Sequence, residues 1–183
     1  MNKVTIRNKY SKKIHLAFYK FHMFRKSTRI YFVMAIGVFV LYLAVRNTMK
    51  GDLDKTNLLI LWSLASFTVL LTPIIMITKT YSIVTQESKE RKETLETLEF
   101  TKDKIVRKVE TVGSVVIGWY DIQKAYETKD AFYLYISNEQ GIVVVKDAIV
   151  QGDVETLRSL INKCMKPNKK GKVPYKKCYK DVK

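Results

Sequence analysis

The sequence is poor in cysteine, with only Cys164 and Cys178 in 183 residues. The two are far apart and neither has a neighbouring histidine, so their spacing matches no zinc site and no redox motif. Two cysteines are also too few to stabilise a chain of this length by disulfide bonds, which excludes a disulfide scaffold. We expect both to be free thiols, and we expect no metal site.

Motifs of the common enzyme classes are missing as well. The lysine-rich stretch 169–172 lacks the upstream glycine and the following serine or threonine of a phosphate-binding loop, and neither a nucleophile elbow nor a dinucleotide fingerprint occurs. Glu127 and Asp130 are close in sequence, but acids at a strand end and a turn are usually solvated, so they do not indicate acid–base catalysis. The sequence therefore predicts no catalytic residues, no cofactor and no enzymatic activity.

Charge is absent from two long stretches, residues 30–45 and residues 58–77. As a helix the second stretch is about 30 Å long, which matches the hydrocarbon core of a bilayer. The first is shorter, but Arg29 and Arg46 can reach the headgroups from its ends. The rest of the chain has too few apolar residues to bury such a hairpin. We therefore expect a transmembrane hairpin over 30–78, with spans at about 30–47 and 58–77.

Acidic residues are absent from residues 1–29, which carry nine basic residues. The loop 46–57 has three basic residues against two acidic ones. The positive-inside rule then places both termini in the cytoplasm and the short loop outside. The sequence predicts a two-span protein of the cell membrane.

The N-terminal segment 1–29 is expected to be basic and amphipathic. Residues 4–6 have strand propensity, Ser11 resembles an N-cap, and a helix follows without Gly or Pro. This helix would lie on the inner leaflet or dock on the C-terminal domain. The cations expected to contact anionic lipid are Lys12, Lys13, Arg25, Lys26 and Arg29. A charged linker helix over 79–95, supported by a Glu87–Arg91 pair, is expected after the second span.

From about residue 96 the hydrophobic pattern alternates with a period of two, which is typical of strands. Turn signals between the runs predict an antiparallel meander. The expected strands are 97–100, 104–109, 114–119, 122–128, 132–137 and 141–146. Asp153 then resembles the N-cap of an amphipathic helix. Together these elements predict an α+β roll over 96–165 in which the helix caps one open end.

The run 132–137 alternates phenylalanine and leucine with tyrosine. Phe132 and Leu134 share one face of the expected strand, and Tyr133 and Tyr135 share the other. We expect the first face to lie in the core and the tyrosine face to be less buried.

A distinctive motif lies within the meander and comprises Trp119, Asp121, Ile122 and Tyr126. With the following run FYLYI, it makes the stretch 98–145 resemble the YcxB-like domain, a bacterial domain usually described as pleckstrin-homology-like (PH-like). The order of an N-terminal segment, two spans and this domain is also similar to that family, up to about residue 165. The resemblance implies a cytoplasmic PH-like roll in which these motif residues are structural.

The tail 166–183 is rich in lysine, so the net charge of +16 is concentrated at the two ends of the chain. A basic surface spread evenly would favour nucleic acid, whereas charge at the ends of a membrane-anchored chain favours anionic lipid. The tail is expected to lie on the inner leaflet or to be solvated and disordered. The expected lipid-contacting residues are Lys169, Lys170, Lys172, Lys176 and Lys177.

Three hypotheses of function follow from these features. The first is a non-catalytic membrane-anchored scaffold that presents its PH-like domain at the inner leaflet and binds an unidentified protein or a second copy of itself. The second is an immunity protein against a membrane-active peptide. The third is an accessory subunit of a larger membrane complex. Membrane lipid is an expected partner in each, and nucleic acid is not.

Overall fold

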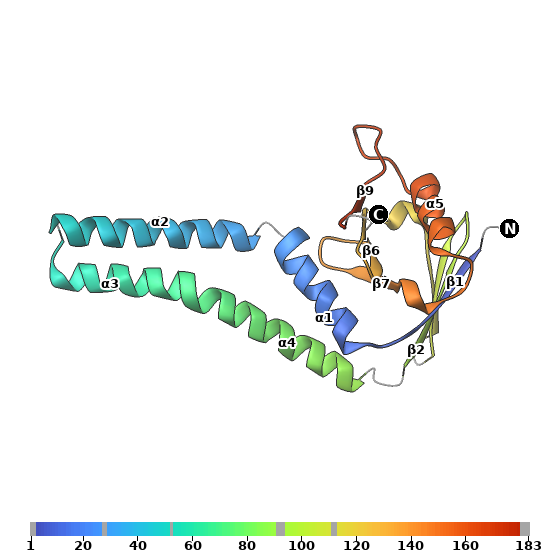
Figure 1. Ribbon diagram of the computed structural model, residues 1–183, viewed down its shortest axis with the longest axis horizontal. Coiled ribbons are helices and arrows are strands. Elements are labelled where there is room, and N and C mark those ends of the chain that lie inside the picture. Colours follow the sequence, from blue (N-terminus) through green and yellow to red (C-terminus); the bar gives the residue numbers. More distant parts are fainter. Residues whose placement is uncertain (1–2, 27–28, 52, 91–93, 111–112, 180–183) are drawn as a thin grey trace. The chain divides into compact units, whose positions relative to one another are not determined.

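The computed structural model describes residues 3–26, 29–51, 53–90, 94–110 and 113–179. The chain divides into two compact units, whose elements are labelled in Figure 1. The helical unit runs from Leu16 to Glu87. The β unit contains the described residues up to His15 and those from Ser88 onward. The helical unit is therefore inserted within the sequence of the β unit.

The helices of the inserted segment follow one another with short connections. They are α1 (Lys12–Phe21), the π-helical η1 (His22–Lys26), α2 (Arg29–Lys50), α3 (Lys55–Ser66), the π-helical η2 (Phe67–Leu71) and α4 (Thr72–Glu90). Asp54 begins α3 as its N-cap by accepting hydrogen bonds from the backbone N–H groups of Thr56 and Asn57.

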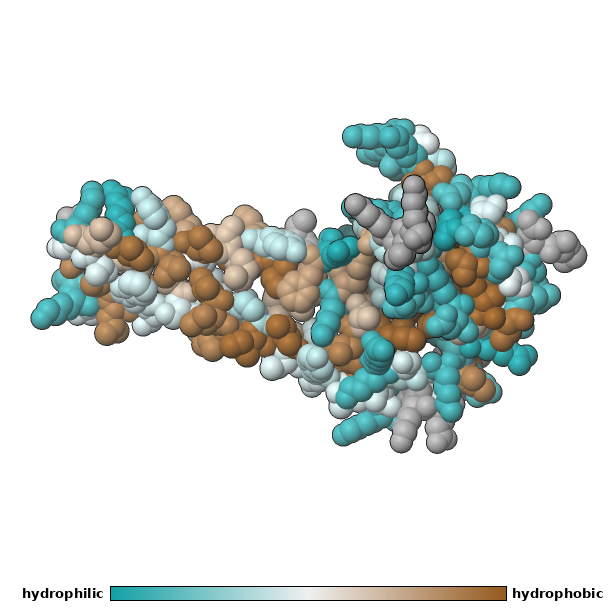
Figure 2. Space-filling model, viewed as in Figure 1, coloured by the Kyte–Doolittle hydropathy of each residue, from teal (hydrophilic) through white to brown (hydrophobic). Residues whose placement is uncertain are grey.

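The two predicted apolar helices are confirmed. Ile30–Lys50 and Lys55–Glu90 are both long and apolar enough to cross a membrane. Figure 2 shows hydrophobic atoms along α2 and α3, and large side chains such as Phe32 and Leu59 are exposed there. The predicted linker helix over 79–95 is helical as far as Glu90, where it continues the second apolar helix as part of α4, and Leu95 already belongs to a strand. Arg91, the expected partner of Glu87, lies outside the described residues.

Small residues let α2 and α3 approach closely. Ala44 and Ala65 are fully buried, and a Cβ on Gly37 would lie only 2.9 Å from Cγ2 of Thr68. At the loop end, Trp62 Nε1 donates a hydrogen bond to Thr48 Oγ1 at 3.0 Å.

The second apolar helix carries a proline, Pro73, directly after its π-helical turn. A proline has no N–H and crowds the preceding turn, so a helix needs a local adjustment to contain one. Here the Thr72 N–H bonds to the carbonyl of Phe67, five residues back. The π turn thus accommodates the proline, and the helix remains continuous.

The β unit contains two sheets. The first has the order β4-β3-β2-β1-β8 and is antiparallel throughout. Its strands are β1 (Val4–Lys9), β2 (Leu95–Phe100), β3 (Ile105–Val109), β4 (Gly113–Ile117) and β8 (Ile149–Gln151). The second sheet has the order β7-β6-β5-β9. Its strands are β5 (Lys124–Glu127), β6 (Ala131–Tyr135), β7 (Gly141–Val145) and β9 (Tyr175–Lys177).

The core of this unit is formed by the inner faces of both sheets and by α5 (Val154–Cys164), which is capped by Asp153 as predicted. Helix α5 contributes its buried stripe of Leu157, Leu160 and Ile161. Short 3₁₀ turns, η3 (Trp119–Asp121) and η4 (Lys146–Ala148), follow β4 and β7.

One face of β6 differs from the prediction. Phe132 and Leu134 belong to the core, as expected, but Tyr133 and Tyr135 are also almost completely buried. The edge of the Tyr126 ring packs against Tyr135, with 5.8 Å between ring centroids. The strand is therefore covered on both faces, and period-two patterning alone could not show this.

Strand β1 is the element that joins the start of the chain to the domain that follows the hairpin. It extends beyond the predicted residues 4–6, and it pairs with β2 along its whole length. The ladder ends at the Lys9–Leu95 pair, where the chain leaves for the inserted helices and returns. Residues 1–29 therefore do not form one N-terminal segment, because part of them lies within the first sheet.

Candidate functional site

A polar recess lies at the end of the first sheet where the inserted segment leaves and re-enters. The apolar inner face of this sheet includes Ile6, Leu98 and Ile105. Since side chains alternate along a strand, the residues two positions further on each strand share that face. On β1, β2 and β3 these are Asn8, Glu96 and Arg107. Asn8 and Glu96 are register partners at this end of the sheet, and Arg107 is the register partner of Leu98 in the row before them.

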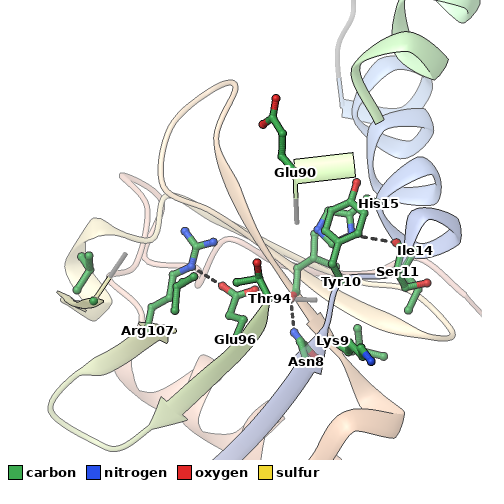
Figure 3. A pocket seen from close by; sticks show the side chains of 15 residues that line it. Asn8, Lys9, Tyr10, Ser11, Ile14, His15, Glu90, Thr94, Glu96 and Arg107 are labelled. Carbon is green, nitrogen blue, oxygen red and sulfur yellow. Dashed lines mark hydrogen bonds and ion pairs between the residues drawn. The ribbon is translucent and has the colours of Figure 1, made fainter. Parts of the chain in front are cut away.

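The recess has a volume of about 310 Å³ and lies wholly within the β unit. Valines from β3, β4 and β7 line it together with polar side chains from β1, β2 and the start of α1. Figure 3 shows the labelled polar residues gathered around it. The apolar lining residues are Ile14, Val109, Val115, Val143 and Val145.

Asn8 is the most buried polar residue of the recess, at 6% exposed. Its Nδ2 donates a hydrogen bond to the carbonyl of Val143 at 3.0 Å. Its Oδ1 is buried and has no hydrogen-bond partner within the described residues. A buried acceptor without a partner costs about 1–3 kcal/mol.

Arg107 and Glu96 form an ion pair between β2 and β3, through Nε of the arginine. Figure 3 shows the guanidinium group of Arg107 extending away from the strand, with its two terminal nitrogens beyond the contact to Glu96. Near the start of α1, the ring of His15 stacks on Tyr10 with 4.2 Å between centroids. The recess therefore offers both donors and acceptors beside an apolar wall.

The described residues that line the recess carry charges of both signs. Lys9 and Arg107 contribute positive charge, and Glu90 and Glu96 contribute negative charge.

A second polar cluster is buried around Glu127, whose side chain is completely buried. Lys146 Nζ and Tyr179 OH each lie 2.7 Å from Oε1. Arg158 binds both carboxylate oxygens, through Nη2 at 2.7 Å and Nε at 3.0 Å. Tyr175 OH also donates to Oε2. We call these four side chains the clamp of Glu127.

The clamp determines the charge state of the carboxylate. Burial alone would raise the pKa of Glu127, but hydrogen bonds from Arg158, Lys146, Tyr175 and Tyr179 outweigh burial and hold that pKa far below its ordinary value. In turn, burial and the hydrogen bond to Glu127 raise the pKa of Tyr175. Glu127 is therefore an ionised anchor at neutral pH.

The expectation that Glu127 is solvated is wrong. The burial of Glu127 was missed because residues at strand ends are usually exposed, but the alternation of side chains along β5 indicates it. Ala125 lies in the core, and Glu127, two positions later, shares its face. The contacts to Tyr175 and Tyr179 join residues far apart in sequence, and no local pattern indicates them.

The C-terminal segment is more ordered than a solvated tail. β9 pairs in parallel with β5, and the Cys178 N–H donates to the backbone carbonyl of Glu127 at 2.8 Å. Within it, Lys177 is half-buried, with Nζ 4.8 Å from the centre of the Tyr179 ring.

The predicted lipid-contacting cations lie on elements of both units. Lys12 and Lys13 lie on α1, Arg25 and Lys26 on the π-helical η1, and α2 begins at Arg29, whose side chain is outside the described set. The remaining residues lie on the segment after α5. Those with exposed side chains are Lys12, Lys13, Arg25, Lys169, Lys170, Lys172 and Lys176.

The motif residues of the meander make internal contacts. Trp119 is 4% exposed, and its Nε1 donates to the carbonyl of Thr101 at 2.8 Å. Asp121 accepts from the Gly118 N–H at 2.9 Å, which closes the turn after β4. Ile122 belongs to the core, and Tyr126 packs on Tyr135. These contacts hold β4 and β5 at the turn between the two sheets.

The comparison with known proteins finds a match that includes this segment. Residues 100–161 match the family model of the YcxB-like proteins. The match confirms the resemblance over β3 to α5, and it includes Glu127 and its partners Lys146 and Arg158. No curated protein and no solved structure matches the chain.

Proposed function

We propose that this chain is a non-catalytic, membrane-anchored binding module that holds a PH-like YcxB domain at the inner leaflet. The observation that carries the proposal is the insertion of a membrane-length helical hairpin between two paired strands of one domain. The anchor is thus attached to the domain through two chain connections that leave the same strand pair.

The pairing of β1 with β2 also constrains the topology. Lys9 and Leu95 are direct partners, so the two ends of the inserted segment emerge side by side. Such pairing requires both ends on one side of the membrane, which agrees with two crossings. The excess of basic residues before the first span favours the cytoplasmic side.

The order of the strands supports a PH-like roll. Strands β1 to β4 are neighbours in one sheet, β5 to β7 are neighbours in the other, and α5 follows and packs on the shared core. This arrangement and the YcxB-like match support the same interpretation. Since fold does not determine function, the PH-like arrangement alone does not establish the binding role.

We also propose anionic lipid as a partner. The turn after α5 presents Lys169, Lys170 and Lys172 to solvent. Each lysine near an anionic leaflet contributes about 1 kcal/mol, so these cations would bias the orientation of the β unit. Replacing all three with glutamine should weaken sedimentation with phosphatidylglycerol vesicles at low salt.

Cysteine labelling tests the membrane topology. One variant is Lys55→Cys in a chain whose native cysteines are replaced by serine, and the other keeps Cys178 alone. A membrane-impermeant maleimide should label residue 55 in intact cells and Cys178 only after permeabilisation. The reverse pattern, or recovery of the chain in the soluble fraction, contradicts the proposal.

A further inference from the structure

We infer that the edge strand β4 is an interface between two copies of this chain, which pair antiparallel through β4 and join their first sheets across a two-fold axis at Val115. This inference rests on the proposed binding function and names the partner. It depends on three features: an unprotected edge strand, a strand sequence that complements itself, and opposite charges at the two ends of the edge.

Strand β4 is an open edge of the first sheet. Among the described residues its only ladder partner is β3, and its sequence, Gly-Ser-Val-Val-Ile, contains neither a charge nor a proline. Val115 and Val116 lie on opposite faces of the sheet and are 55% and 61% exposed. Native proteins usually protect an edge with charges, prolines, bulges or a covering segment, because an open edge can pair with another strand.

The other three edges of the two sheets carry such protection. Strand β8 is only three residues long, β9 has two lysines among its three residues, and the three central residues of β7 are buried. Within the described part of the β unit, β4 is therefore the edge best suited to extend a sheet into a second molecule.

The sequence of β4 complements itself when two copies run antiparallel. With Val115 opposite Val115 of the second copy, Ser114 lies opposite Val116, and Gly113 lies opposite Ile117. Side chains directly opposite one another have Cβ atoms about 4.5–5.5 Å apart and pack together. Each larger side chain away from the axis thus meets a small one, and this match favours a second copy over an unrelated strand.

The charges near the edge also favour the antiparallel pair, although the net charge of the chain is +16. On β3, Arg107 and Lys108 are paired with glutamates of β2, so two copies can approach without strong repulsion. Exposed Glu110 lies beside the start of β4, and two lysines and one aspartate, residues 102–104, lie beside its end. The two-fold axis brings the acidic end of each copy to the basic end of the other.

The size of the contact indicates where the dimer forms. Five residues per copy are far fewer than the roughly 20–30 per side of a stable interface, which buries about 1,200–2,000 Å². Two chains anchored in one leaflet meet at a high effective concentration, which favours a weak contact. The dimer is therefore expected in membranes, and its test uses the membrane-bound full chain.

Cysteine crosslinking tests the pairing. In a chain whose native cysteines are replaced by serine, Val115→Cys places two thiols opposite one another at the axis, and oxidation with copper phenanthroline should link two copies by a disulfide. Val150→Cys is the matched control, because Val150 is 59% exposed and lies on β8, at the other edge of the same sheet. The dimer of V115C should form at least tenfold faster than that of V150C.

A charge swap tests the same contact without a covalent bond. Two V115K chains place like charges opposite one another, whereas V115K with V115E places opposite charges there. In proteoliposomes with donor-tagged and acceptor-tagged chains, energy transfer should fall at least fivefold for V115K alone and should recover when V115K is mixed with V115E. Position 115 is more than half exposed, so these variants should fold.

Three results would overturn the inference: equal crosslinking rates for V115C and V150C, energy transfer that V115K does not change, or no recovery in the mixture of V115K and V115E. Crosslinking of V115C to a different protein instead of a second copy would also overturn it and would assign the β4 edge to that partner. A chain recovered in the soluble fraction contradicts the membrane proposal, whereas a membrane-bound chain without dimers contradicts only the inference about β4.

Discussion

A single carboxylate connects the second sheet, α5 and the C-terminal segment. Glu127 receives hydrogen bonds from Lys146 after β7, from Arg158 on α5, and from Tyr175 and Tyr179. A buried charge is costly unless it is paired and hydrogen-bonded, and this one is both. Its partners come from three separate parts of the chain, so their positions depend on one another.

Removing the charge should therefore weaken the β unit. Glu127→Gln keeps the shape but leaves Lys146 without its counter-charge and Arg158 with only the exposed Glu155, and we expect a loss of about 3 kcal/mol in the free energy of unfolding. Glu155→Gln is the matched control, because Glu155 also pairs with Arg158 but its side chain is 77% exposed. Its expected effect is below about 0.5 kcal/mol. Denaturant unfolding followed by tryptophan fluorescence in a Trp62→Phe background, which leaves Trp119 as the reporter, measures both, and similar losses would contradict the clamp.

The dependence of stability on pH should also show the contribution of Glu127. The pKa of Glu127 is depressed in the folded protein, so its contribution to stability is complete above its ordinary pKa of 4.5 and declines as the pH falls below that value. The unfolding temperature should decrease below about pH 4.5. The decrease should be smaller in Glu127→Gln, which has no proton to bind. If the unfolding temperature fell equally with pH in both proteins, the acid sensitivity would come from other carboxylates.

At the scale of elements, the helical hairpin depends on close approach between α2 and the second apolar helix. Gly37 lies against Thr68 and Val69, with almost no room for a side chain. In the proposed membrane-spanning hairpin, such contacts would replace the hydrophobic effect, which does not drive association between helices in lipid.

A larger residue at this position should separate the helices. Gly37→Leu should destabilise the hairpin by about 1–3 kcal/mol through overpacking. Val38→Leu, one position along on an exposed part of α2, should have little effect. Thermal loss of helical circular dichroism in micelles measures the difference, and equal melting temperatures would show that the contact contributes no stability.

Elements whose signal is local could be predicted from sequence. The charge-free runs predicted α2 and the second apolar helix, and alternation predicted β2 to β7. The pairing of β1 was missed, because its partner β2 lies beyond the whole hairpin in sequence. β9 was missed because its short, lysine-rich sequence resembles a solvated tail, and its position depends on Glu127. The recess could not be foreseen either, since it requires the register of four strands to be known.

At the scale of the whole molecule, the chain is a β domain interrupted by a helical insertion. The interruption falls between neighbouring strands, and the last pair of their ladder is Lys9 with Leu95. This is the geometry that a two-residue hairpin turn would close in an uninterrupted antiparallel pair.

Excision of the insertion should therefore leave a domain that folds alone. Replacement of residues 10–94 with Asn-Gly joins β1 to β2 through a turn of the favoured type. We expect a protein that stays in solution after ultracentrifugation, with the circular dichroism of a sheet-rich domain and the fluorescence of a buried Trp119. An aggregated or unfolded product would show that the β unit needs the helices for its stability.

The position of the insertion also determines the order of events during synthesis. β1 leaves the ribosome before either apolar helix, and its partner β2 leaves only after both. In a chain that crosses the membrane twice, the first sheet cannot form until the hairpin has been made. If the second helix failed to insert, β1 and β2 would lie on opposite sides of the bilayer and could not pair. In such a chain, folding of the β unit thus requires that both helices insert. A misinserted chain would expose unpaired strands to proteolysis.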